Sequence, residues 1–341
     1  MTKGRWLLLA MTCFVVAFYT FVVVTNLLIS PQDPSKASAE NAQIIKELKE
    51  KEAAAQKNLL ARPVLFNALS SLFLTVLIAG IFLDSRFLLR LHRGRPGIEG
   101  PAEKREVRWG GTEVAVGFVF LLFSEAILVA GLEVLRRILG FGAQFSETMV
   151  YASSLLRNVL IIFFIGMLIK RRHGSGLKEM GLRFERAGDD LRTGFLGYIA
   201  ILPPLLLTFA FVGAMLHIFS LEPAPQNVVQ VFLKDSTSSY LVPLTVFVAL
   251  VGPALEEIFF RGFAYAGLRK RFGVWPSACI ASGAFAALHM NAVAFFPIFV
   301  LGMFLAYLYE RSGSLIPSIT AHMLHNAIMV ALTLGFKGLS A

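Results

Sequence analysis

The chain alternates long apolar segments with short basic or turn-rich ones over almost its whole length. An apolar segment of about 20 residues is long enough to cross the hydrocarbon core of a bilayer as an α-helix, because each residue adds about 1.5 Å. A segment in lipid must also satisfy its own backbone hydrogen bonds, which favours helices over open strands. We therefore predict an all-α fold, a polytopic bundle of transmembrane helices.

About nine segments are predicted to span the membrane. They cover approximately residues 6–29, 63–83, 112–132, 151–169, 195–219, 241–268, 275–290, 296–309 and 314–334. The number falls to eight if the first segment is cleaved or miscounted. Ala37-Ser38-Ala39 has the small-x-small form of a signal-peptidase site, but the apolar region before it is longer than signal peptides usually carry. We favour a retained anchor. Pro203 and Pro204 predict a kink or break in the fifth span.

Two polar segments separate the early spans. Residues 31–61 are rich in Ala, Lys and Glu and have only a patchy apolar stripe, which predicts a solvated helical arm, with a partner-binding arm as the alternative. Residues 84–111 carry many arginines among Gly and Pro, which predicts a basic, irregular cytosolic loop. The same charge rule places the amino terminus in the cytosol and the carboxyl terminus outside, although it leaves Arg136 and Arg137 on the outer side.

The composition agrees with a membrane protein. Of 341 residues, 56% are hydrophobic and only 16% are charged, and the mean hydropathy is +0.68. The net charge of +10 is better explained by cytosolic loops than by nucleic-acid binding, because no compact soluble basic domain is visible. Cys13 and Cys279 lie within apolar segments and predict no disulfide framework. We expect a multi-pass protein of the plasma or an equivalent inner membrane.

One apolar segment carries an unusual group of charges. Glu256, Glu257 and Arg261 lie within six residues of a predicted span, and each central charge costs about 2.5–3.5 kcal/mol to insert. Such a group is by default a functional site that faces the protein interior or water. The i to i+4 spacing of Glu257 and Arg261 predicts an ion pair. Pro253 is expected to free the carbonyl four residues earlier and to open the helix locally.

Polar residues recur in two later spans. Phe285 and His289 are four residues apart and therefore share one helical face, and His322 and Asn326 do the same. Counting about 1.5 Å per residue from the basic end of each helix puts Glu256 and His289 at the same depth, about 20 Å inward. The same count places His322 and Asn326 about 8–14 Å along their helix from residues 314–317. The polar groups are thus predicted to converge between the cytosolic half and the midplane of the bilayer.

This convergence suits hydrolysis of an amide. Glu256 is expected to act as a general base and, with His289, to hold and activate a water molecule. His322 and Asn326 are expected to donate hydrogen bonds to the oxyanion that forms when the carbonyl is attacked. A buried Glu–Arg pair on its own is more often structural, and a single membrane histidine can simply cap a carbonyl. The joint occurrence on three helices favours catalysis.

Other polar or aromatic positions receive weaker interpretations. We interpret His325 as packing or as support for His322, and Phe285 as packing. No role is predicted for His92, His173 and His217, which lie in loops or at span ends.

The motif order resembles that of a known family, the CAAX prenyl-protease and bacteriocin-processing (CPBP, Abi) intramembrane proteases. The matches are Glu256-Glu257 with Arg261, Phe285 with His289, and His322 with Asn326. The resemblance covers about residues 241–334 and is specific as a combination. It implies an endopeptidase that cuts at or within the membrane, with a membrane-associated peptide or a lipidated protein as substrate. It also implies Glu256 and His289 as water-activating residues and His322 and Asn326 as oxyanion donors.

The resemblance also divides the chain. It implies a catalytic domain over residues 191–341, preceded by amino-terminal spans over residues 1–190. Because these spans do not visibly belong to the motif region, they weaken a simple transfer of CAAX specificity. Members of the family are commonly called metalloproteases, and Glu256, His289 and His322 are enough in number for a zinc site. No HExxH helix is present, so we favour a reaction without obligatory zinc.

Two other functions are compatible with the pattern. A non-proteolytic membrane scaffold or bacteriocin-immunity factor could retain the motif for structure. A transporter could use Glu256 and Glu257 as a proton relay, but the inverted repeats that such a protein predicts are not found. We rank the protease first.

Overall fold

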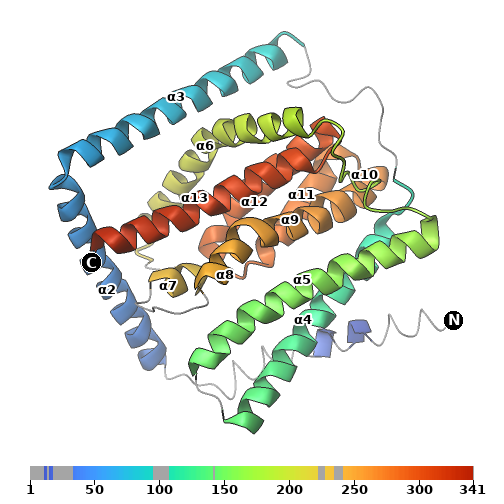
Figure 1. Cartoon of the computed structure of the whole chain (residues 1–341), viewed down its shortest axis with the longest axis horizontal. Coiled ribbons are helices and arrows are strands. Elements are labelled where there is room, and N and C mark those ends of the chain that lie inside the picture. Colours follow the sequence, from blue (N-terminus) through green and yellow to red (C-terminus); the bar gives the residue numbers. More distant parts are fainter. Residues whose placement is uncertain are drawn as a thin grey trace.

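The computed structural model describes residues 11–13, 15–17, 34–94, 107–140, 143–221, 227–233 and 241–340. These residues form helices joined by turns, as Figure 1 shows. The α-helices are α2 Pro34–Leu60, α3 Pro63–His92, α4 Gly111–Leu139, α5 Ala143–His173, α6 Ala187–Ile218, α7 Asn227–Leu233, α8 Leu241–Val246, α9 Gly252–Glu257, α10 Ala266–Phe272, α11 Val274–Ala287, α12 Ala292–Ser312 and α13 Ile316–Ser340. Two π-helical segments, η1 Phe247–Val251 and η2 Ile258–Tyr265, join α8, α9 and α10 into one long helix.

Seven helical segments within the described residues are long and apolar enough to cross a membrane. They are Pro63–Arg90, Gly111–Leu139, Ala152–His173, Ala187–Ile218, Leu241–Phe272, Ala292–Ser312 and Ile316–Ser340. The predicted polytopic all-α bundle is therefore confirmed, whereas the number nine is not. The seventh predicted span is the short helix Val274–Ala287, and the first lies mostly outside the described residues.

The helices pack around a central group formed by α6, α12, α13 and the long helix from residue 241 to 272. In Figure 1, α13 crosses the middle of the molecule beside α6, and α4 and α5 lie side by side along one edge. Helix α3 packs against α6. The main hydrophobic core takes buried residues from α4, α5, η2, α11, α12 and α13. This core crosses the division predicted at residue 190, and that division stays a prediction.

The predicted polar arm is helical, but it is not free of the bundle. It forms α2, which packs against α13. The Asn58 side chain donates a hydrogen bond of 2.7 Å to the Leu339 carbonyl, and Ala55 is buried. The arm is therefore attached to the end of the helix that carries His322.

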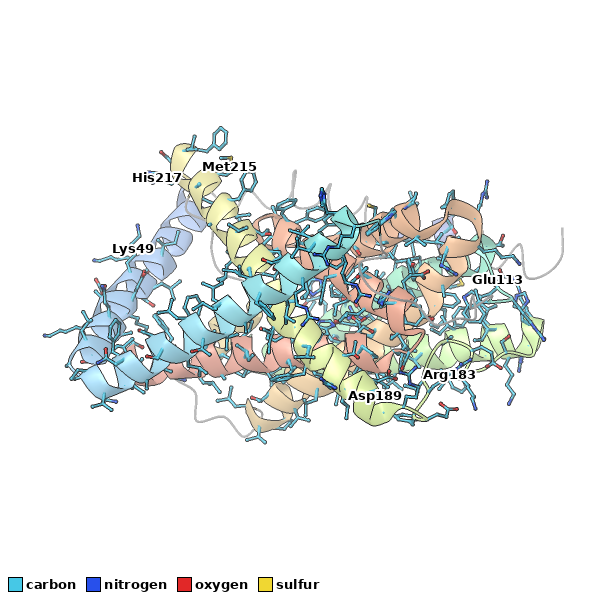
Figure 2. The ribbon with its side chains drawn as sticks, turned by 90° about the horizontal axis from the view of Figure 1, so that it is seen from above. Lys49, Glu113, Arg183, Asp189, Met215 and His217 are labelled. Atoms are coloured by element: carbon cyan, nitrogen blue, oxygen red, sulfur yellow. The ribbon has the colours of Figure 1, made fainter. Side chains whose placement is uncertain are left out.

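Two predictions about local structure concern α3 and α6, and the first was wrong. The predicted basic loop from residue 84 begins later, because α3 continues to His92; Leu88 and Leu89 extend its apolar surface while the long arginine side chains can reach towards polar surroundings. Helix α6 continues through Pro203 and Pro204, so it is not broken there, and the predicted kink stays a prediction. Figure 2 shows its two ends, with Asp189 near the first and His217 near the last residue.

Several polar contacts hold the helix ends around the site. The indole of Trp109 donates to the Phe263 carbonyl at 2.9 Å, which ties the start of α4 to η2. Glu113 on α4 pairs with Arg172 at the end of α5 at 3.2 Å. The Tyr309 hydroxyl donates to the Met180 carbonyl at 2.8 Å and so attaches α12 to the loop before α6. These contacts hold the start of α4 close to η2 and to the end of α5, and they attach α12 to the loop before α6.

Candidate active site

Glu257 and Arg261 form the ion pair that their spacing predicts. Arg261 Nη1 lies 2.6 Å from Glu257 Oε1, and the two side chains are 1% and 0% exposed. Arg261 Nη2 also donates to the Gly302 carbonyl on α12 at 3.0 Å. The guanidinium carbon lies 4.7 Å from the centre of the Phe285 ring, within cation–π range. The pair thus fixes η2 against α11 and α12.

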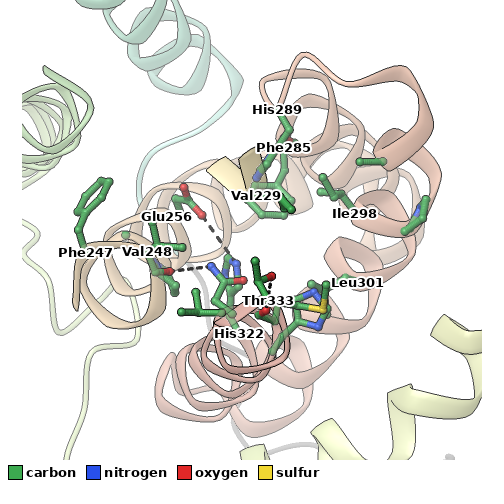
Figure 3. Close-up of a pocket in the computed structure, with 18 of the residues that line it drawn as sticks. Val229, Phe247, Val248, Glu256, Phe285, His289, Ile298, Leu301, His322 and Thr333 are labelled. Atoms are coloured by element: carbon green, nitrogen blue, oxygen red, sulfur yellow. Dashed lines mark hydrogen bonds and ion pairs between the residues drawn. The ribbon is translucent and has the colours of Figure 1, made fainter. Parts of the chain in front are cut away.

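His322 joins this pair to the second glutamate. Its Nδ1 lies 2.9 Å from Glu257 Oε1, and its Nε2 lies 3.8 Å from Glu256 Oε2. Figure 3 shows Glu256 and His322 pointing toward each other across the cavity. Because an ionised carboxylate only accepts hydrogen bonds, Nδ1 donates to Glu257. The Nε2 atom therefore faces Glu256, and it can donate only when the ring carries both protons.

The two adjacent glutamates face different surroundings. The Glu257 side chain is fully buried in its contacts with Arg261 and His322, whereas the Glu256 side chain is 25% exposed. Consecutive residues on a helix point about 100° apart, which allows one carboxylate to face the core and the other a cavity. This is the arrangement expected if Glu256 contacts water and Glu257 supports the structure.

The π-helical segment η1 explains the position of Asn326. The Gly252 N–H bonds to the Phe247 carbonyl five residues earlier. In the same register, the N–H of residue 253 would bond to the Val248 carbonyl. That position is Pro253, which has no N–H. The Asn326 side chain donates to the Val248 carbonyl instead, at 2.9 Å. In this π-helical register the proline leaves the Val248 carbonyl, five residues earlier, to the Asn326 side chain. The freeing of the carbonyl four residues earlier stays a prediction.

His289 lies just beyond the end of α11, in the turn before α12. The predicted span reached residue 290, but the helix ends at Ala287. His289 Nδ1 lies 2.8 Å from the Phe285 carbonyl, and the two rings make an edge contact at 4.8 Å. Because a carbonyl only accepts, Nδ1 carries the hydrogen and Nε2 is left as an acceptor in the neutral ring. Such a nitrogen can take a proton from water.

These side chains line two cavities. The larger, about 520 Å³, is lined by Glu256, His289, His322 and Asn326, the four predicted catalytic residues. The smaller, about 250 Å³, is also lined by Glu256 and His289. The structure thus brings all four residues to one cavity, although their catalytic roles stay a prediction. His325 also lines the larger cavity, and its buried Nδ1 has no hydrogen-bond partner among the described residues.

Sequence reasoning missed several polar residues that line these cavities, among them a second ion pair. Glu125 on α4 and Arg157 on α5 form an ion pair of 2.6 Å. Arg157 and its neighbour Asn158 line both cavities, and Glu125 lines the smaller one. The signal was present in the sequence, because a glutamate and an arginine within predicted spans carry the same insertion cost as Glu256.

The side chains do not fit the zinc site considered from the sequence. Within the parts of the chain that the structure describes, no three His, Cys, Asp or Glu side chains are grouped closely enough to hold a metal ion.

The region that carries these residues is similar to known proteins. Residues 238–328 match the family described as type II CAAX prenyl endopeptidase Rce1-like. A segment of 94 residues is 31% identical to the Bacillus subtilis (strain 168) protein named "Putative membrane peptidase YdiL". The carboxy-terminal region is therefore similar to the CAAX prenyl endopeptidase family and to a protein named as a membrane peptidase, which supports the resemblance found in the motifs.

The matched region includes every predicted catalytic residue, since Glu256, His289, His322 and Asn326 all fall within residues 238–328. The similarity to the Bacillus protein covers 27% of this chain and 38% of that protein, so the chain spans well under half of that relative's length in the match. No solved structure is significantly similar to the chain. The apolar helices and the family match together indicate an integral membrane protein.

Proposed function

We propose that this protein is an intramembrane endopeptidase that hydrolyses a peptide bond with a water molecule activated by Glu256 and His289. The observation that carries the proposal is the shared cavity, which is lined by Glu256, His289, His322 and Asn326 together. Glu257 and Arg261 provide the buried support on which Glu256 and His322 are held.

The attacking water loses its proton to the Glu256 carboxylate as its oxygen bonds to the carbonyl carbon. The hydrogen-bond acceptor at His289 Nε2 orients the same water. The carbonyl π-bond opens, and negative charge develops on its oxygen. When the C–N bond then breaks, protonated Glu256 returns the proton to the leaving amine, which balances the reaction.

Two donors are proposed for the oxyanion. The doubly protonated His322 ring can donate from Nε2, and its positive charge would lie beside the carboxylates of Glu256 and Glu257. The Asn326 amide has two N–H donors, one of which bonds to Val248. The other is available for the oxyanion. One missing donor of this kind typically lowers kcat by about 10²–10³-fold.

The substrate is proposed to be a membrane-associated peptide or a lipidated protein, with CAAX-type removal of carboxy-terminal residues as one form. The support is the family match over residues 238–328 and the apolar lining of the larger cavity, to which Leu205, Leu301 and Val330 contribute. An apolar cavity of this kind suits an apolar peptide segment or a lipid chain.

The test is a comparison of peptide termini in membranes from cells that produce the wild-type chain or the Glu256→Gln variant. We expect new termini that require the wild type, and their loss in Glu256→Gln and in His289→Ala. Glu50→Gln is the matched control, because Glu50 lies exposed on α2. Cleavage by a folded Glu256→Gln variant that equals cleavage by the wild type would refute the proposal.

A second function is supported by the structural use of the motif. His322 and Asn326 both bond within the bundle, to Glu257 and to the Val248 carbonyl. A non-proteolytic scaffold or a bacteriocin-resistance factor could keep these residues for stability alone. This function predicts that Glu256→Gln retains the resistance phenotype in full.

A further inference from the structure

A second ion pair lies inside the bundle, outside the family motif. Arg157 Nη1 is 2.6 Å from Glu125 Oε2. Arg157 Nε and Nη2 are 3.3 Å and 3.1 Å from Asn158 Oδ1. The Arg157 and Glu125 side chains are 24% and 34% exposed, unlike the sealed pair of Arg261 and Glu257 at 1% and 0%. This pair therefore remains accessible from a cavity.

The cavities connect this pair with the proposed hydrolytic residues. Arg157 and Asn158 line the larger cavity and the smaller one, and so do Glu256 and His289. A group bound at Arg157 would thus lie in the same space as a peptide bond presented to Glu256.

The depth of the pair limits what it can bind. The start of α4 and the end of α5 meet where Glu113 pairs with Arg172. Counting from these residues, Glu125 and Arg157 both lie about 20 Å along their helices, as Glu256 does from Arg269. Phospholipid head groups lie at the bilayer surface, about 15 Å from the midplane. An anionic group at this depth is better supplied by a peptide than by a lipid.

The hydrogen bonds of Arg157 leave room for such a group. A guanidinium has five N–H donors. The contacts to Glu125 and Asn158 use one N–H each on Nε, Nη1 and Nη2, which leaves one N–H on each Nη. Two N–H groups on a planar guanidinium match the two oxygens of a carboxylate. Glu125 and Asn158 hold the arginine in place but do not exhaust its donors.

We propose that Arg157, positioned by Glu125 and Asn158, binds a carboxylate of the substrate peptide beside Glu256 and His289. The proposal rests on the proposed function, because it names the group that orients the peptide for cleavage. The carboxylate can belong to the carboxyl terminus of the peptide or to an acidic side chain, and the experiment separates these sources.

The experiment measures binding and does not depend on cleavage. The full-length Glu256→Gln chain in nanodiscs is titrated with an apolar Leu–Ala peptide that carries an uncharged fluorophore. The peptide is used with a free carboxyl terminus, with a terminal carboxamide, and with a carboxamide plus one internal glutamate. We expect the carboxylate to improve affinity about tenfold or more. Preference for the first peptide alone assigns the chain terminus, and preference for the third assigns a side chain.

Arg157→Gln in the same background should remove the preference, and Arg157→Lys should keep only part of it because the fork of donors is lost. If Arg157→Gln does not fold, the Glu125→Gln/Arg157→Gln double variant replaces the ion pair by two amides and should also show no preference. Arg136→Gln is the control, since Arg136 pairs with Glu133 on α4 and lines neither cavity. It should leave the preference unchanged.

Equal binding of all three peptides, including binding of none, would overturn the inference, and so would a preference that survives in folded Arg157→Gln. A failure of the proposed function looks different. In that case the wild type cleaves no peptide, while the Glu256→Gln chain still shows the preference that depends on Arg157.

Discussion

His322 Nδ1 lies 2.9 Å from Oε1 of Glu257, the same oxygen that Arg261 Nη1 approaches at 2.6 Å. One carboxylate oxygen therefore holds a cation on one side and the imidazole that faces Glu256 on the other. Removing this oxygen's charge affects the helix packing and the imidazole together. The two adjacent glutamates should consequently respond very differently to the same substitution.

Glu257→Gln should lower the free energy of unfolding by about 3–5 kcal/mol, because it leaves Arg261 buried without a counter-charge. Glu256→Gln should change it by less than about 1 kcal/mol, since that side chain faces a cavity, while it abolishes cleavage. Chemical unfolding of the purified chain in detergent, followed by tryptophan fluorescence, compares the two. Equal stability of both variants would show that the buried pair does not support the fold.

Gly302 provides a test of the contact that orients Arg261. A Cβ at this position would lie 2.9 Å from Ser282 Cβ and 3.3 Å from Arg261 Nη2. Gly302→Ala should therefore destabilise the protein by about 1–3 kcal/mol through overpacking and should displace the guanidinium. Gly283→Ala is the matched control, because a Cβ there meets nothing within 4 Å. The two variants are compared in thermal unfolding, and the prediction fails if their midpoints shift alike.

Asn326 and Pro253 should be coupled through the Val248 carbonyl. Asn326→Ala leaves this carbonyl without its side-chain donor and should cost about 1–3 kcal/mol. In a Pro253→Ala background the new backbone N–H can bond to the same carbonyl, so the cost of Asn326→Ala should fall by about 1 kcal/mol or more. A double-mutant cycle on unfolding free energies measures this coupling. Additive effects would show that the two residues act independently.

The same cycle separates the structural role of Asn326 from its proposed chemical role. If the second amide N–H stabilises the oxyanion, Pro253→Ala restores stability but not cleavage. Recovery of cleavage together with stability would limit Asn326 to the support of η1.

Some of these contacts could be predicted from the sequence and others could not, and the difference has physical reasons. The i to i+4 ion pair of Glu257 and Arg261 follows from helix geometry alone and is present. The contact between His322 and Glu257 depends on how α13 packs against the long helix, and no local pattern encodes it. The contact of Asn326 with the Val248 carbonyl depends on the π-helical register of η1, which residue preferences do not reveal.

Glu125 and Arg157 were missed for a different reason. Their insertion cost is the same as that of Glu256, but each stands alone in an apolar span, 32 residues apart in sequence. Only the packing of α4 on α5 turns two isolated charges into a pair. The free-energy cost of inserting a charge into the bilayer applies to every charged residue within a span. On that ground both Glu125 and Arg157 are candidates for a functional site.

Phe285 offers the last test, because its ring touches three of the polar groups. Its centre lies 4.8 Å from that of His289 and 5.6 Å from that of His322, with the Arg261 guanidinium carbon at 4.7 Å. Phe285→Leu keeps much of the volume and should cost less than about 1.5 kcal/mol in stability. It removes the edge contacts that orient both imidazoles, so cleavage should fall by about tenfold or more.

The matched control is Phe263→Leu, a change of the same size at a fully buried ring that contacts Trp109 and lines neither cavity. Both variants should unfold at similar denaturant concentrations, since each loses an aromatic contact in the same core. Only Phe285→Leu should lose cleavage, because only that ring touches the histidines. Equal activity of the two variants would mean that Phe285 is a packing residue, and the imidazoles would then be positioned by their hydrogen bonds to Glu257 and the Phe285 carbonyl alone.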